Sequence, residues 1–152
     1  IDKNNNWPRI DRLRYLAEHK IDFKEVAPAH VINFFKSKQP FSGYGEMKYG
    51  EALLIAGKET MAKQLIKEGF VKAFLSKDDF SYVSKKYKYI LTSEDFIKRA
   101  EYMAWENEYW ELKKHYKNNK IRFFKIIKII VRLPSISFVF CVNDRSVKLF
   151  VQ

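Results

Sequence analysis

Short runs of apolar residues at helical spacing, each closed by a helix-breaking residue, fill most of this chain. The clearest run is YGEALLIAG, residues 49–57, which is followed at helical spacing by Met61, Ala62, Leu65 and Ile66. Gly57 separates the two runs, and glycine readily adopts the left-handed backbone conformation that ends a helix. The pattern predicts two helices joined as a hairpin, in which small residues let the pair approach closely.

Helix-start signals predict further helices on both sides of this hairpin. Pro8 suits a first helical turn and opens an amphipathic run over about residues 8–19. Ser76 and Thr92 are each followed three residues later by an aspartate, which is a capping-box arrangement. These two signals predict helices over about residues 77–88 and 93–106.

One more helix is expected between the first helix and the hairpin. It begins near Asp22 or Pro28 and stops before the Gln39-Pro40 pair, because the residue before a proline is disfavoured in helices. The segment 41–45, FSGYG, is expected to form a loop. The face that this helix buries is expected to contain Val26, Ala29, Ile32 or Asn33, and Phe35.

A weak internal repeat indicates how these helices are arranged. Shifting the chain by 50 positions places Ala52, Gly57 and Ala62 on Tyr102, Asn107 and Leu112. Both segments then consist of an apolar helix, a residue that tolerates the left-handed conformation, and a second apolar helix. With residues 8–38 as a third pair, the predicted fold class is all-α: stacked antiparallel helix pairs forming part of an α-superhelix, with a divergent C-terminal tail.

The positive charge of the chain is concentrated in that tail. The formal net charge is +11, of which residues 117–152 carry +7 and residues 1–116 only +4. We therefore predict two parts: residues 1–116, a helical superhelix domain fragment, and residues 117–152, a basic hydrophobic tail that is out-of-frame or disordered. The body has the mixed charge of an ordinary protein surface, which argues against nucleic acid as its partner.

Three interpretations of the tail stay open. Residues 121–133 set basic side chains along one stripe of an apolar helix, as in helices that lie on membrane surfaces. A nucleic-acid arm is the second interpretation. The third is translation outside the original reading frame, because acidic residues almost disappear after residue 116. We favour the third, with membrane contact next. Residues 135–142 alternate like a strand, and no partner strand is evident.

No combination of residues indicates a catalytic, cofactor-binding or metal-binding site. His19, His30 and His115 lie far apart and belong to no metal-binding pattern, so packing or surface roles are expected. Cys141 is the only cysteine, which excludes an intrachain disulfide. The adjacent acids lie at predicted helix starts or turns, where they favour the helix dipole: Asp78 with Asp79, Glu94 with Asp95, and Glu106 with Glu108. We also expect no buried acid that could break a bond.

Two other patterns are assigned to structure rather than to ligand binding. Residues 43–45, GYG, are too short for a phosphate-binding loop and are expected to form a turn. Four aromatic residues near the end of the helical body have the spacing of one helix face: Tyr102, Trp105, Tyr109 and Tyr116. Such a face could stack on sugars or bases, but core packing is the favoured interpretation.

The chain resembles the helical superhelix, or U-shaped, domain of soluble lytic murein transglycosylases over about residues 7–116. Three stretches carry the resemblance: residues 28–35, PAHVINFF; residues 50–66, from Gly50 to Ile66; and residues 91–105, from Leu91 through Asp95 and Arg99 to Trp105. The resemblance implies a periplasmic parent enzyme that cleaves the glycan strands of peptidoglycan. In this family the helical superhelix supports a separate lysozyme-like catalytic domain.

The motif of that catalytic domain does not occur in this sequence. It opens with a Glu-Ser pair and a Gly-Leu-Met-Gln run, and neither is present. We therefore expect a noncatalytic fragment that contacts peptidoglycan or a partner protein through its concave face. No signal peptide is visible, and Ile1 suggests processing or a piece of a longer chain. The alternative is a stand-alone helical-repeat module whose basic tail contacts a membrane or nucleic acid.

Overall fold

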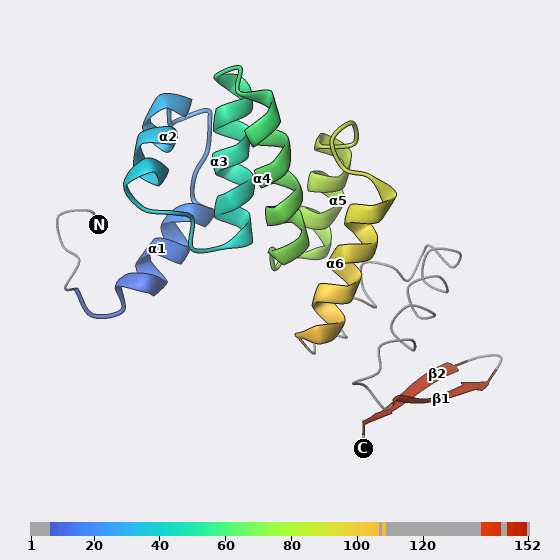
Figure 1. Ribbon diagram of the computed structural model, residues 1–152. Helices are drawn as coiled ribbons and strands as arrows, with labels where there is room; N and C mark the ends of the chain where they lie inside the picture. The colour runs from blue at the N-terminus through green and yellow to red at the C-terminus, as the bar shows by residue number, and fades with distance from the viewer. Residues whose placement is uncertain (1–6, 107, 109–137, 144–145, 152) are drawn as a thin grey trace. The chain divides into compact units, whose positions relative to one another are not determined.

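The computed structural model describes residues 7–106, 108, 138–143 and 146–151. The chain divides into two compact units, Ile1–Tyr102 and Met103–Gln152. Within the described ranges there are six helices, α1 (Ile10–His19), α2 (Pro28–Ser37), α3 (Gly43–Ile55), α4 (Glu59–Lys72), α5 (Lys77–Lys86) and α6 (Ser93–Trp105), as Figure 1 shows. The all-α prediction is thereby confirmed for the body of the protein.

Helices α3 and α4 form the predicted hairpin and lie side by side along their whole length (Figure 1). Gly57 ends α3 with φ of +78°, the left-handed conformation expected there. A Cβ atom added at Gly50 would lie 2.8 Å from Cγ1 of Ile66, and one at Gly43 would lie 2.7 Å from the carbonyl oxygen of Gly69. The two helices therefore approach closely because glycines occupy their contact points.

The main core joins this hairpin to α5 and α6. Its buried residues come from α3, α4, α5 and their connections: Met47, Ile66, Phe70, Ala73, Leu75, Val83, Tyr87 and Leu91. At its centre Phe70 packs against Phe80 and Phe96, with ring centroids 6.0 and 5.0 Å away. Arg99 is fully buried beside these rings and donates a hydrogen bond to the carbonyl oxygen of Phe70. That carbonyl belongs to the last turn of α4, where carbonyl groups lack partners within the helix.

A second, smaller core attaches α2 to α3. Val31, Phe35 and Ala52 are its buried members, and Phe35 contacts Tyr49 with ring centroids 5.3 Å apart. The prediction that Phe35 lies on the buried face of this helix is confirmed. Val26 and Ile32 also pack against this core as expected, whereas Ala29 and Asn33 are exposed and Val31, which was not predicted, is buried. Val31 and Phe35 are four residues apart and therefore lie on the same face of α2, which begins at Pro28.

Two of the predicted helix caps are present as expected. The Oγ atom of Ser76 accepts a hydrogen bond from the amide of Asp79 at 3.1 Å, and α5 begins at Lys77, directly after Ser76. The carboxylate of Asp95 accepts hydrogen bonds from the amide and hydroxyl of Thr92, at 2.7 and 2.8 Å. The interpretation of these aspartates as helix-start residues is confirmed.

The prediction of a loop over residues 41–45 is wrong for residues 43–45. Helix α3 begins at Gly43, so residues 43–45 form its first turn rather than a turn between elements. Ser42 is the N-cap, and its Oγ atom accepts a hydrogen bond from the amide of Gly45 at 3.0 Å. Glycine is a weak helix former, and here the cap and the close packing against α4 override that local preference.

The C-terminal unit contains a strand pair that the sequence pattern only half predicted. Strand β1 (Phe138–Asn143) pairs antiparallel with β2 (Ser146–Val151), with Asn143 opposite Ser146 and Phe138 opposite Val151. The strand was expected, but the statement that it has no partner is wrong. The amphipathic segment 121–133, the boundary at residue 116 and the aligned residues Asn107 and Leu112 lie outside the described residues. Among the helices that are described, none is long and apolar enough to cross a membrane.

Candidate functional site

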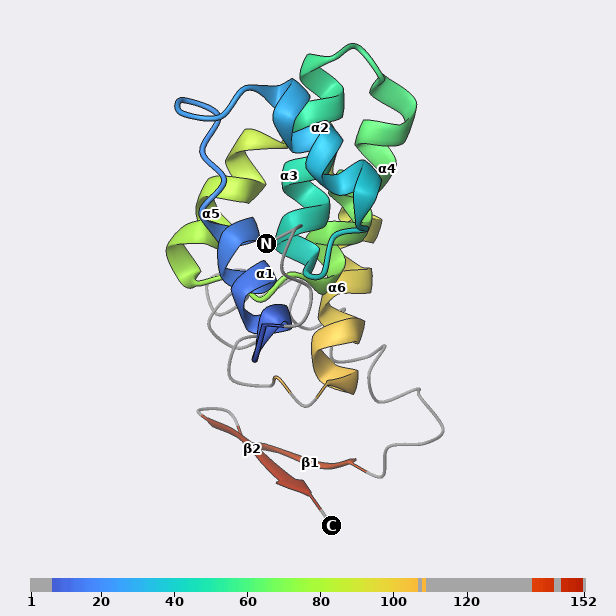
Figure 2. The same cartoon turned by 90° about the vertical axis from the view of Figure 1, so that its left-hand side faces the viewer.

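A hollow of about 260 Å³ lies between α1, α3, α4 and α6 within the first unit. Helix α1 lies beside the N-terminal end of α3 in both views of the fold (Figures 1 and 2). Six ring-bearing side chains line the hollow: Tyr15, His19, Phe41, Tyr44, Phe74 and Tyr102. We call this feature the aromatic hollow.

Three of these rings form a continuous stack from α1 to α3. The ring of His19 lies between Tyr15, with centroids 4.2 Å apart, and Tyr44, with centroids 4.6 Å apart and planes 12° from parallel. Nδ1 of His19 is 2.8 Å from the carbonyl oxygen of Tyr15. Because a carbonyl only accepts hydrogen bonds, Nδ1 of His19 is the donor in this contact. His19 therefore packs between two tyrosine rings.

The charged side chains of the hollow are paired with each other. Nζ of Lys72 lies 3.0 Å from Oε1 of Glu46, and among the described residues these are the only lysine and the only acid in its lining. Oε2 of Glu46 is buried and has no hydrogen-bond partner among the described residues. The hollow therefore carries little net charge and includes a carboxylate oxygen without a donor.

A buried acid, Glu18, supports the edge of the hollow from α1. Its side chain is fully buried, and its carboxylate accepts hydrogen bonds from the amides of Phe41 and Ser42 at 2.6 and 2.8 Å. It also accepts one from Oγ of Ser42 at 2.5 Å. The sequence predicted no buried acid that could break a bond, and it did not predict that Glu18 would be buried as a structural group. Both carboxylate oxygens are engaged in holding the start of α3, where the helix dipole favours negative charge.

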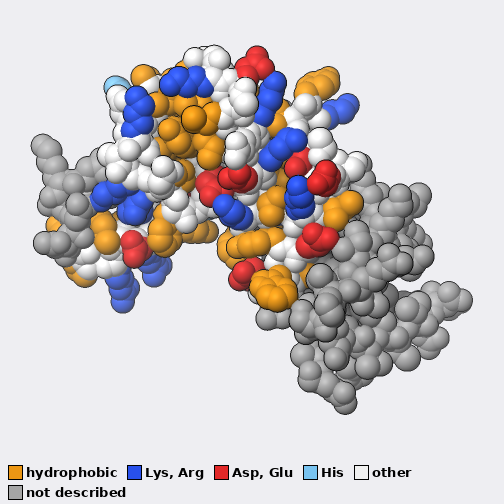
Figure 3. Space-filling view, viewed as in Figure 1, with side chains coloured by type: hydrophobic (Ala, Val, Ile, Leu, Met, Phe, Trp, Pro, Cys, Tyr) orange, Lys and Arg blue, Asp and Glu red, His pale blue; other side chains and the backbone are white. Residues whose placement is uncertain are grey.

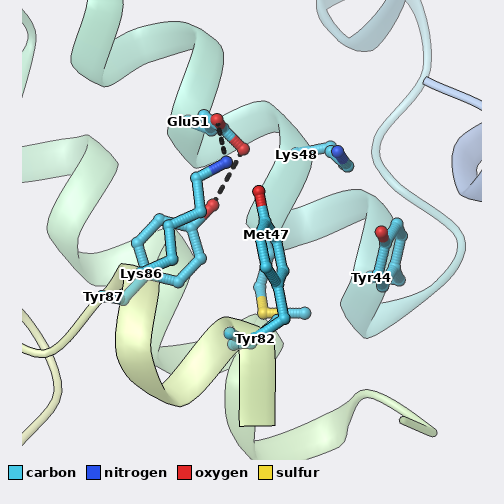
Figure 4. Close-up of a pocket in the computed structure, with 8 residues that line it drawn as sticks. Tyr44, Met47, Lys48, Glu51, Tyr82, Lys86 and Tyr87 are labelled. Atoms are coloured by element: carbon cyan, nitrogen blue, oxygen red, sulfur yellow. Dashed lines mark hydrogen bonds and ion pairs between the residues drawn. The ribbon is translucent and has the colours of Figure 1, made fainter. Parts of the chain in front are cut away.

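A second polar cluster lies between α3 and α5 (Figure 4). Glu51 accepts hydrogen bonds from Nζ of Lys86 and from the hydroxyl of Tyr87, the latter at 2.8 Å. Burial, and then the charge of Glu51, raise the pKa of the Tyr87 phenol above its ordinary value. Burial disfavours the charge of Lys86, but its hydrogen bond to Glu51 and the Glu51 charge outweigh burial and raise the pKa of Lys86.

This second cluster is a clamp between helices rather than a ligand site. The crevice beside it measures about 10 Å³, about the space that one water molecule needs. Tyr82 stands at its edge next to Glu51 and Lys86, as Figure 4 shows. The cluster therefore attaches α5 to the hairpin and leaves the aromatic hollow as the candidate binding site.

The histidines and the aromatic face that the sequence analysis considered occupy different places in the structure. His30 is exposed on α2, His19 lies in the aromatic hollow, and His115 lies outside the described residues. No group of three potential metal ligands occurs among the residues that the structure describes. Of the predicted aromatic face, Tyr102 lines the hollow and Trp105 is 62% exposed, whereas Tyr109 and Tyr116 lie outside the described residues. The core interpretation is therefore wrong for Trp105.

Figure 3 shows one face of the helical body, on which both acidic and basic side chains occur. On the face shown in Figure 3, acidic and basic side chains are interspersed rather than gathered in patches of one sign. No family model, no curated protein and no solved structure matches this chain. Its function must therefore be argued from the aromatic hollow and the helices around it.

Proposed function

We propose that this chain is a noncatalytic helical scaffold of the kind that supports the catalytic domain in soluble lytic murein transglycosylases. In this proposal the helix pairs form part of an α-superhelix, the parent enzyme cleaves the glycan strands of peptidoglycan in the periplasm, and the fragment contacts peptidoglycan or a partner protein. The proposal is supported by residues 28–35, 50–66 and 91–105, which carry the resemblance to this family.

The observation that carries the proposal is that the α3–α4 hairpin packs against neighbouring helices on two sides, through two separate cores. The α3–α4 hairpin buries one side against α2, through Val31, Phe35 and Ala52. It buries another side against α5 and α6, where Phe70 meets Phe80 and Phe96. In repeat proteins each pair likewise packs on the next, and the resulting extended surface is used for binding. An architecture of this kind favours a role in binding or support.

The buried acid Glu18 is not placed to act as a general acid. A general acid for glycan cleavage needs a carboxylate whose proton can reach the glycosidic oxygen. Glu18 is instead hydrogen-bonded through both oxygens to the backbone and side chain at residues 41–42. Its position and its partners are those of a structural cap.

The test of the proposed function is a sedimentation assay with purified murein sacculi. We expect the full chain to sediment with the sacculi and to release no anhydro-sugar ends from them. Release of anhydro-sugars would contradict the noncatalytic role. A chain that stays in the supernatant, at a concentration where a known peptidoglycan-binding domain sediments, would contradict the contact with peptidoglycan.

The second candidate function is a stand-alone helical-repeat module with a basic tail. It is favoured by the charge distribution, since +7 of the +11 lies in residues 117–152. Electrostatic binding to anionic vesicles or DNA weakens as salt is raised. Salt-sensitive binding that disappears when residues 117–152 are deleted would favour this function over the first.

A further inference from the structure

We propose that the aromatic hollow binds a single uncharged sugar ring of a glycan. This inference deepens the proposed function and rests on it for the choice of glycan, but the site is argued from its size, walls, charge and rigidity. Of the residues of the hollow, only Tyr102 belonged to a sequence pattern considered for sugar stacking, and core packing was the favoured interpretation of that pattern.

The size of the hollow matches one ring rather than a larger ligand. Its volume is about 260 Å³, whereas pockets for drug-sized ligands occupy roughly 300–1,000 Å³. The hollow is also open to solvent on one side, since Phe41 and Phe74 in its lining are 53% and 51% exposed. One unit of a longer chain could therefore be seated while its neighbours continue outside.

The walls of the hollow combine ring faces with hydroxyl groups. Tyr15, Tyr44 and Tyr102 each present an aromatic surface and a phenol that donates or accepts hydrogen bonds. A sugar ring has one apolar face of C–H groups and a rim of hydroxyls. The slightly positive C–H groups suit the negative face of an aromatic ring, and the hydroxyls suit the phenols.

The charges of the hollow argue against phosphorylated or strongly ionic ligands. Lys72 is paired with Glu46 at 3.0 Å, so none of the described lysine or arginine residues in the lining is left for a phosphate. Phosphates bind such cations or a helix N-terminus, and at the N-terminus of α3, which lines the hollow, the buried carboxylate of Glu18 already supplies a negative charge that would repel a phosphate. Glu46 keeps one oxygen, Oε2, without a donor, and a ligand rich in hydroxyls offers donors to this carboxylate. An uncharged sugar meets both conditions.

The hollow is also held in shape before a ligand arrives. Gly43 lines it and packs so closely on α4 that an added Cβ would lie 2.7 Å from the carbonyl oxygen of Gly69. Next to Gly43, Phe41 and Ser42 are fixed by their hydrogen bonds to buried Glu18. A preformed site loses less conformational entropy on binding, which helps a small ligand with few contacts.

The experiment is a titration of the full chain with N-acetylglucosamine, followed by amide chemical shifts in NMR spectra. We expect saturable shifts centred on Tyr15, His19 and Tyr44, with an affinity in the millimolar range typical of one small ring, about 1 mM or weaker. The comparison ligands are the 6-phosphate of the same sugar, which should bind no more tightly, and tryptophanamide, which should bind more weakly.

Two variants separate the site from general effects on folding. Phe74→Ala removes a half-exposed ring of the hollow, and we expect roughly fivefold weaker binding from the loss of one aromatic contact. Tyr89→Ala is the matched control, because Tyr89 is 95% exposed and lies outside the lining. It should leave the affinity within about twofold of the original.

The outcomes distinguish failure of this inference from failure of the proposed function. Tighter binding of the phosphate or of tryptophanamide, or shifts away from the hollow, would overturn the sugar site even if the chain sediments with sacculi. Saturable binding of the sugar in the hollow by a chain that ignores sacculi would support the site and overturn the peptidoglycan proposal. Equal effects of the two variants would also refute the site.

Discussion

Replacing Glu18 should destabilise the protein more than its single position in a short helix suggests. Its carboxylate accepts two backbone N–H groups and one hydroxyl, and all of its surface is buried. Hydrogen bonds to a charged group contribute about 1.5–3 kcal/mol each, and these three share one acceptor group, so they do not add fully. We expect Glu18→Ala to lower the free energy of unfolding by about 3–5 kcal/mol, because it leaves buried donors unpaired.

The isosteric variant Glu18→Gln tests whether the loss comes from hydrogen bonding rather than from volume. One carboxylate oxygen faces the amide of Phe41 and the other faces Ser42. Whichever oxygen becomes the NH₂ group, it meets another donor, so we expect a loss of about 1–3 kcal/mol. The control is Glu25→Gln, since Glu25 is exposed, and it should cost less than about 0.5 kcal/mol.

The assay is urea unfolding followed by circular dichroism, with the slope of the transition compared between variants. Gly45→Ala supplies a second, independent check, because its Cβ would lie 2.6 Å from Cδ of Glu18. Alone it should destabilise by about 1–3 kcal/mol. Combined with Glu18→Ala, which removes the clashing atoms, it should become neutral or stabilising, as alanine is about 1 kcal/mol better in helices. A Glu18→Gln loss as small as the control, or additive costs in the double variant, would refute the reasoning.

Three further predictions concern caps and charge. Gly57→Ala should cost about 1 kcal/mol in urea unfolding, because φ is +78° there and an added Cβ meets no other atom, so only backbone strain counts. Ser76→Ala should cost about 1 kcal/mol by removing the cap on the amide of Asp79, and Ser76→Asp should restore most of it. Tyr87 has a raised pKa through burial and the Glu51 charge, so the folded state keeps its proton where the unfolded state loses it. Stability should then fall as pH rises through about 10, and less steeply in Tyr87→Phe; equal slopes in thermal unfolding would contradict this.

The elements that local chemistry determines could be predicted from the sequence. The caps at Ser76 and Thr92 involve groups only three residues apart, and the break at Gly57 depends on the backbone of one residue. Such signals do not need the tertiary fold, and the helices that follow them begin where they were expected. The start of α3 was missed because Gly43 and Gly45 are poor helix formers, and only packing against α4 and Glu18 reveals why glycines stand there.

The aromatic hollow could not be predicted because its lining comes from four helices that are distant in the sequence. Tyr15 and Tyr102 are 87 positions apart, and both contribute to it. The stack of Tyr15, His19 and Tyr44 has one visible trace, since Tyr15 and His19 are four residues apart and so share a helix face. Nothing local indicates that Tyr44 completes it, because that contact exists only when α1 lies beside α3.

Glu18 contributes both to the start of α3 and to the aromatic hollow, the two features that could not be predicted from the sequence. Its hydrogen bonds set the backbone at residues 41–42, which both begins α3 and forms one edge of the hollow. The same side chain explains why Gly45 lacks a Cβ, since Glu18 fills that space. An isolated glutamate near the end of a predicted helix looks like an ordinary surface residue. In this fold it ties the entry of the central hairpin to the walls of its candidate binding site, so that its loss should weaken both.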